Sequence, residues 1–174
     1  SGGDFGFPVT INAGINALKA YDDLLVNFVG DKNGIERELN NNSLYSRLSD
    51  RIFITHANEV INMDDSASEA LRHKKDSSMR VAINLVKDGE ADACVSAGNT
   101  GALMSIARFV LKTISGVDRP AIMSAVPTLK GPTHVLDLGA NIDSKPSTLL
   151  QFAIMGSIAV QNTENIDNPS VGLL

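Results

Sequence analysis

The sequence has little of what marks secreted, membrane-spanning and nucleic-acid-binding proteins. It holds one cysteine among 174 residues, so no disulfide can form within the chain, and nothing points to an oxidising compartment. The apolar stretch at residues 149–160 is well short of the roughly 20 residues that a bilayer requires. A formal net charge of −5 argues against a nucleic-acid partner, since such proteins are usually basic. These shortages indicate a soluble cytoplasmic protein.

What the chain does contain is enough apolar material for a core, because 43% of its residues are hydrophobic. Short apolar runs alternate with stretches of helical periodicity, which is typical of a parallel sheet covered by helices. We expect strands at 24–29, 51–55, 93–95, 121–126, 133–138 and 171–174, and helices at 8–21, 32–39, 67–73, 79–88, 102–112 and 148–161. The prediction is a single α/β domain over 1–174, a three-layer α/β/α sandwich with a mostly parallel sheet.

The most informative stretch is a turn of small residues, Ser96–Gly101, placed between an expected strand and an expected helix. This arrangement directs free backbone N–H groups and the positive end of a helix toward an anion. Gly98 has no Cβ to hold a phosphate away from the backbone, and Asn99 and Thr100 offer further donors. The alternative is a tight turn in which Asn99 or Thr100 only caps the helix. The loop alone leaves both interpretations open.

Two other turns belong with this one. Gly2-Gly3-Asp4 stands at the start of the sequence, and Asp137–Asn141 follows another expected strand. In an open parallel sheet, ligands bind beyond the carboxyl ends of the strands, so the three turns are predicted to meet at one edge. The carboxylates of Asp4 and Asp137 either take part in proton transfer and orientation or cap their own loops.

Five motifs occur in order along the chain. They are Gly2-Gly3-Asp4-Phe5-Gly6, Lys75-Asp76-Ser77-Ser78-Met79, Val95-Ser96-Ala97-Gly98-Asn99-Thr100-Gly101-Ala102, Arg119-Pro120 and Asp137-Leu138-Gly139-Ala140-Asn141. Together they resemble the PlsX family of bacterial phosphate acyltransferases, and the resemblance runs from the first residue to the last. It implies a fold related to isocitrate and isopropylmalate dehydrogenases and to phosphotransacetylase. It also implies that this chain is the N-terminal portion of a longer family chain.

The resemblance implies reversible transfer of a fatty acyl group from acyl carrier protein to inorganic phosphate, giving acyl phosphate for phosphatidic acid and phospholipid synthesis. We assign catalysis to Asn99 and Asp4. Phosphate and substrate binding is assigned to Gly2, Gly3, Ser96, Gly98, Asn99, Thr100, Gly101, Asp137, Gly139 and Asn141. No cofactor and no metal are expected. The alternatives are an acyl-coenzyme A enzyme similar to phosphate acetyltransferase, or a non-catalytic phosphate-binding fragment.

A basic cluster offers a docking surface, because acyl carrier proteins are strongly acidic. We assign docking to Arg72, Lys74, Lys75 and Arg80, with a solvated helix end as the alternative. The resemblance further implies a homodimer and peripheral membrane association, through a downstream acyltransferase or segments outside this sequence. Cys94 has no histidine near it in sequence and is expected to be a buried thiol, not a nucleophile.

Overall fold

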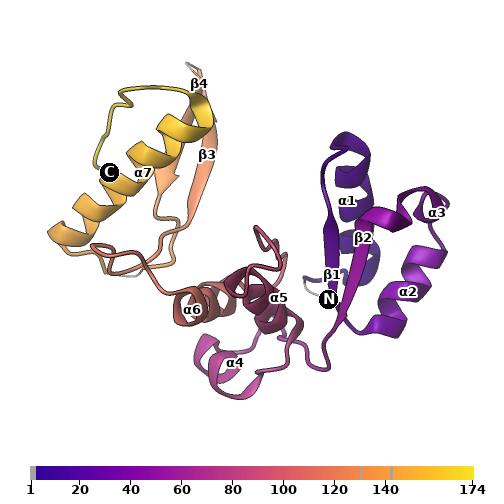
Figure 1. Cartoon of the computed structure of the whole chain (residues 1–174). Helices are drawn as coiled ribbons and strands as arrows, with labels where there is room; N and C mark the ends of the chain where they lie inside the picture. The colour runs from indigo at the N-terminus through magenta and orange to yellow at the C-terminus, as the bar shows by residue number, and fades with distance from the viewer. Residues whose placement is uncertain (1–2, 130, 142) are drawn as a thin grey trace. The chain divides into compact units, whose positions relative to one another are not determined.

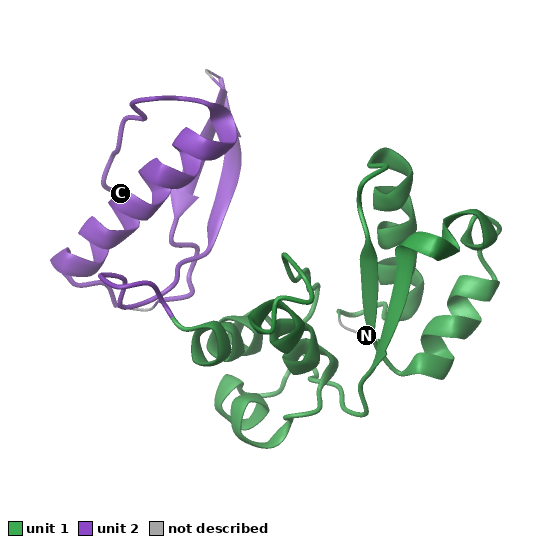
Figure 2. Ribbon diagram, in the orientation of Figure 1, with its two compact units in different colours: residues 1–112 green, residues 113–174 purple. Residues whose placement is uncertain are grey.

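The computed structural model describes residues 3–129, 131–141 and 143–174. The chain divides into two compact units, residues 1–112 and residues 113–174 (Figure 2), and each is described by itself. The prediction of Gly2 as a binding residue lies outside the described residues.

The first half of unit 1 packs three helices around a two-stranded parallel sheet (Figure 1). Its elements are α1 (Phe7–Ala20), β1 (Val26–Gly30), α2 (Lys32–Asn40), α3 (Tyr45–Leu48), the 3-10 turn η1 (Ser49–Arg51) and β2 (Ile52–His56). The core consists of Ile11, Ile15, Leu18, Ile35, Leu39 and Ile52. Gly34 lies within α2 and does not interrupt it. A Cβ there would lie 2.7 Å from the Phe7 ring, so the glycine lets α2 approach α1 closely.

One arginine, Arg51, holds the connection between α1 and β1. The Arg51 guanidinium donates to the carbonyl oxygens of Leu18 at 2.9 Å and Tyr21 at 2.8 Å, and also to those of Asp22 and Leu24. These carbonyls belong to the last turn of α1 and to the connection into β1. A guanidinium can satisfy several acceptors at once because its five N–H groups are held in a fixed plane. Arg51 therefore fixes the path of the chain from α1 into β1.

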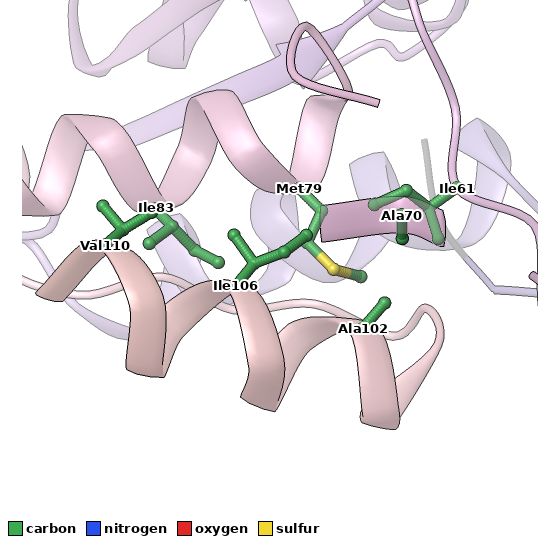
Figure 3. Close-up of a cluster of buried hydrophobic side chains, with 7 residues drawn as sticks. All are labelled: Ile61, Ala70, Met79, Ile83, Ala102, Ile106 and Val110. Carbon is green, nitrogen blue, oxygen red and sulfur yellow. The ribbon is translucent and has the colours of Figure 1, made fainter. Parts of the chain in front are cut away.

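The second half of unit 1 is helical and contains α4 (Ala67–His73), α5 (Ser78–Lys87) and α6 (Thr100–Leu111). Ser66 and Ser77 cap α4 and α5, since their hydroxyls accept from the N–H groups of Glu69 and Arg80 at 3.1 and 3.3 Å. Figure 3 shows the side chains that fill the space between the helices, among them Met79, Ile83 and Ile106. This packing holds α6 against α4 and α5.

The strand expected at 93–95 does not form. Residues 93–95 have no regular structure, and the Val95 side chain is 98% exposed. A strand needs a neighbour to pair with its N–H and C=O groups, and β1 and β2 pair only with each other in the described chain. Three apolar residues supply too little hydrophobic contact to order a strand without such a partner. The loop leading into α6 is therefore irregular.

Unit 2 is an antiparallel hairpin with a helix packed against it (Figure 1). The strands are β3 (Met123–Thr128) and β4 (Gly131–Leu136), and the helix is α7 (Pro146–Glu164), longer than the predicted 148–161. Phe152 and Val160 are buried, whereas Leu150, Ile154 and Ile158 form an exposed apolar stripe at a spacing of four. The strand expected at 171–174 does not form, because this segment has no pairing partner among the described residues of unit 2.

The α/β class is confirmed, with one parallel pair in unit 1 and one antiparallel pair in unit 2. β3 and β4 pair antiparallel because only a short turn joins them, and the three-layer sandwich with a mostly parallel sheet stays a prediction. In the described part of the chain, no helix is both long enough and apolar enough to cross a membrane.

Candidate active site

The beginning of α6 carries the glycine-rich loop. Asn99 is its N-cap, and the Asn99 Oδ1 accepts from the N–H of Ala102 at 3.0 Å. Ser96 is bonded within the loop, where its hydroxyl accepts from the N–H of Gly98 at 3.2 Å. The N–H groups of Thr100 and Gly101 have no acceptor among the described residues, and both residues are exposed. Two backbone donors at the positive end of a helix are thus open to an anion.

The side-chain amide of Asn99 points into the protein. Its Nδ2 donates to the carbonyl oxygens of Asn62 at 3.3 Å, Met63 at 3.1 Å and Asp65 at 2.8 Å. Asn99 is only 9% exposed. The capping interpretation of Asn99 is therefore confirmed. Its role as a phosphate donor stays a prediction, and the amide would have to leave these carbonyls to fulfil it.

The N-terminal glycine turn lies directly against this loop. A Cβ built on Gly3 would stand 2.9 Å from the carbonyl oxygen of Ala97, so no larger residue fits without movement. Gly3 also has φ +78°, a backbone conformation that residues other than glycine rarely adopt. Two of the three turns predicted to meet do lie side by side, both within unit 1.

An open cavity of about 240 Å³ lies beside the Gly3 turn. It is lined by Gly3, Asp4, Gly6, Val60, Ile61, Asn62 and Met63. Val60 and Met63 are 46% and 51% exposed, so this cavity wall presents apolar side chains. The Asp4 side chain is exposed and has no hydrogen-bond partner in the described chain. A lining that combines apolar side chains with backbone and carboxylate groups is typical of a site for a ligand that is part apolar and part polar.

The basic cluster does not face solvent as one surface. Arg72 and Lys75 are exposed, but Lys74 turns onto the segment 60–65, where it pairs with the Asp65 carboxylate. The Arg80 guanidinium lies 5.5 Å from the centre of the Phe109 ring, and its buried Nε has no partner among the described residues. Of the four residues assigned to docking, Lys74 is already engaged inside the protein.

The third predicted turn belongs to unit 2 and is closed by its own residues. Asp137 Oδ1 accepts from the N–H of Ile122 at 2.9 Å, and its Oδ2 accepts from the N–H and Nδ2 of Asn141 at 2.7 and 2.9 Å. Burial acts to raise the pKa of the Asp137 carboxyl, but these hydrogen bonds outweigh it and hold the pKa below its ordinary value. Asp137 caps its own loop, and Gly139 has φ +81°. The meeting of this turn with the other two stays a prediction.

The surroundings of the single cysteine disfavour its thiolate form. Cys94 is half-buried against the helical core of unit 1, and burial raises the pKa of its thiol. A protonated thiol is a poor nucleophile. Among the residues that the structure describes, no group of three His, Cys, Asp or Glu side chains is placed to hold a metal ion.

Sequence reasoning missed the segment that forms the cavity wall. Val60–Met63 has no motif, and Asp65 stands next to Ser66 in a polar stretch before the expected helix at 67–73. Ser66 is the cap, while Asp65 pairs with Lys74 from the other end of α4. Only the nine-residue spacing of a carboxylate and an ammonium hints at this pair, and such spacings are common in polar segments.

Comparison with known proteins identifies the family to which this chain belongs. A family model described as "Fatty acid synthesis protein" matches residues 1–174. Proteins named "Phosphate acyltransferase" from Vesicomyosocius okutanii and Ruthia magnifica are each 62% identical to the chain, which they match along its whole length. One from Methylococcus capsulatus is 54% identical over 173 residues. The chain covers 51%, 51% and 50% of these three relatives, so it spans about half of their length.

Proposed function

This chain belongs to the fatty acid synthesis protein family, and on that premise we propose that the full-length protein is a phosphate acyltransferase. The observation that carries the proposal is the match to relatives of that name along the whole chain at 62% identity. The acyl donor is a fatty acyl thioester of acyl carrier protein, and the acceptor is inorganic phosphate. The product is an acyl phosphate for phospholipid synthesis.

The chemistry needs no covalent enzyme intermediate. A phosphate oxygen attacks the thioester carbonyl and forms a C–O bond, and the C–S bond then breaks. The carrier thiolate leaves with the electron pair and takes up the proton that hydrogenphosphate loses. Catalysis consists of positioning the two substrates and stabilising the oxyanion that develops on the carbonyl. The inert setting of Cys94 is consistent with direct transfer.

In this proposal, phosphate binds at the beginning of α6. The N–H groups of Thr100 and Gly101 supply hydrogen bonds, and the helix end supplies positive potential. Gly98 and Gly101 keep side chains out of the approach. The adjoining cavity, with Val60 and Met63 on its wall, receives the thioester and the first part of its apolar chain. Asp4 is placed at the cavity to take part in proton transfer to or from the departing thiol.

The remaining assignments complete the proposal. In unit 2, Asp137, Gly139 and Asn141 contribute to substrate binding in the full-length protein. Arg72, Lys75 and Arg80 guide the acidic carrier protein. The full-length chain folds as a three-layer α/β/α sandwich and acts as a cytoplasmic homodimer with peripheral membrane association. The exposed apolar stripe on α7 supports this part of the proposal, because both a dimer interface and a membrane surface make contact with apolar side chains.

The test is an assay of the purified full-length protein with inorganic phosphate and palmitoyl-acyl carrier protein. We expect one carrier thiol released for each acyl phosphate formed, with the acyl phosphate detected by phosphorus NMR. Parallel reactions contain acetyl-coenzyme A or no thioester. Preference for acetyl-coenzyme A would identify a phosphate acetyltransferase, and absence of acyl phosphate from every thioester would overturn the proposal.

A further inference from the structure

The Lys74 ammonium lies inside a network of the chain's own acceptors. Lys74 follows the last residue of α4, and its Nζ donates to the carbonyl oxygen of Val60 at 2.9 Å and to the Asp65 carboxylate. The side chains of Lys74 and Asp65 are 23% and 18% exposed. An exposed lysine is usually solvated, and ordering its long side chain has an entropic cost. Here the ammonium is instead held by two groups of the segment 60–65.

Asp65 extends this contact back into the same segment. The Oδ2 atom that pairs with Lys74 also accepts from the N–H of Asn62 at 2.7 Å. The Lys74 hydrogen bond, followed by that from the Asn62 N–H, holds the pKa of the Asp65 carboxyl below its ordinary value. One ionised oxygen thus joins the end of α4 to the backbone of the cavity wall.

The wall is fixed at points along its whole length. Lys74 holds Val60, Asp65 holds Asn62, and Asn99 holds the carbonyls of Asn62, Met63 and Asp65. Just before the wall, the N–H of Ser78 donates to the Glu59 carbonyl at 3.0 Å. A loop positioned by side chains from two different helices has one preferred path. That path places Val60 and Met63 beside the Gly3 turn.

We infer that Lys74 and Asp65 are positioning residues, which hold the Val60–Met63 wall in place and thereby set the affinity of the cavity for the apolar part of the acyl donor. This inference rests on the proposed function. Under this inference, Lys74 does not belong to the surface that receives the carrier protein, because its ammonium group is bound to the Asp65 carboxylate and the Val60 carbonyl. Without Lys74, the Asp65 carboxylate loses its counter-ion and the Val60 carbonyl loses its donor.

The experiment compares Lys74→Met, Asp65→Asn and the double variant in the full-length enzyme, with Lys87→Met as the matched control. Lys87 is exposed near the far end of α5. Each enzyme is assayed with two acyl donors, palmitoyl-acyl carrier protein and palmitoyl-pantetheine, which has no protein part. A role in docking affects only the first donor, whereas a role in holding the wall affects both.

For both donors, we expect Lys74→Met and Asp65→Asn to raise KM by roughly 5- to 50-fold, with the KM for phosphate changed less than about twofold. The KM of the double variant for the acyl donor should be no higher than that of the more impaired single variant, since the two residues act as one unit. Lys74→Arg should restore most of the affinity, while Lys87→Met should match the wild type. An increase confined to the carrier-protein donor would overturn the inference and return Lys74 to docking.

A second measurement does not depend on activity. The N–H of Asn62 donates to Asp65, so its hydrogen exchange reports whether the wall is held. We expect faster exchange at Asn62 in Lys74→Met and Asp65→Asn than in Lys87→Met. Unchanged exchange would overturn the inference even if the enzyme is an acyltransferase. Faster exchange in a protein without acyltransferase activity would refute the proposed function and leave the held wall established.

Discussion

The Nδ2 of Asn99 donates to the carbonyl oxygen of Asp65 at 2.8 Å, across 34 positions of sequence. The same side chain caps α6 through its Oδ1, which accepts from Ala102. One amide therefore joins the beginning of α6 to the segment 62–65, part of which lines the cavity. The geometry of both parts depends on Asn99.

Replacing this amide should lower stability. We expect Asn99→Ala to reduce the free energy of unfolding by about 2–3 kcal/mol, because the cap and the bonds to the segment 62–65 are lost together. Asn99→Asp keeps an acceptor for Ala102 but turns a carboxylate toward three carbonyl oxygens, so it should also destabilise. Urea unfolding measures both. Thr100→Ala, at an exposed neighbour, should cost less than about 0.5 kcal/mol, and an equal loss in Thr100→Ala and Asn99→Ala would contradict the assignment.

The contact between Gly3 and Ala97 predicts that Gly3→Ala lowers the stability by more than backbone strain alone would. Gly3→Ala places a methyl group 2.9 Å from the Ala97 carbonyl oxygen, in a residue with φ +78°. Gly89 has nearly the same φ, +76°, with nothing within 4 Å, so Gly89→Ala measures the strain alone. Thermal unfolding should show a larger fall in Tm for Gly3→Ala, by roughly 2–4 °C for each further kcal/mol. An equal decrease in Tm for the two variants would mean that the Gly3 turn and the Ala97 loop are not in close contact.

A proline can test the backbone donors of α6 without removing the helix. Thr100 is the first helical residue, a position that tolerates proline, and Asn99 before it has an extended ψ of 112°. Thr100→Pro deletes one N–H and should raise the KM for phosphate by roughly 10-fold or more in the full-length enzyme. Thr100→Ala keeps the N–H and serves as the comparison. If both variants have the same KM for phosphate, the hydroxyl or another group holds the anion.

The lowered pKa of Asp137 makes unit 2 sensitive to acid. A carboxyl whose pKa is lower in the folded state stabilises the fold above its unfolded pKa of about 4, and this contribution is lost as the pH falls through the folded value. Asp137→Asn should therefore show a smaller difference in unfolding free energy between neutral pH and pH 3 than the wild type. Asn141→Ala removes one donor and should give an intermediate result. Urea unfolding across this pH range measures the effect, and an unchanged profile in Asp137→Asn would refute it.

Local chemistry in the sequence was enough to predict most helices. Ser66 and Ser77 stand directly before α4 and α5 and cap them, and α4 spans the predicted Ala67–His73. A serine cap, a periodic apolar face and a glycine stop all lie within a dozen residues of one another. Segments whose ends depend on such neighbours are readable without knowledge of the rest of the chain.

Features that depend on distant partners were not predictable in this way. The run at 93–95 has a strand-like composition, but it pairs with nothing described in unit 1. Lys74 has the sequence context of a surface cluster, and only the folded chain brings Val60 and Asp65 to it. The cap at Asn99 was one of two interpretations, whereas the three carbonyls that it binds lie more than 30 residues away.

Arg51 contributes to the stability of the fold and is not part of the candidate site. Its guanidinium ties together the turn leaving α1, whereas the cavity and the beginning of α6 draw on other residues. A lysine could not replace it, because a single ammonium cannot reach four carbonyls spread over residues 18–24. Loss of the Arg51 contacts would lower the melting temperature. The molecules that remain folded would keep their affinity for each substrate.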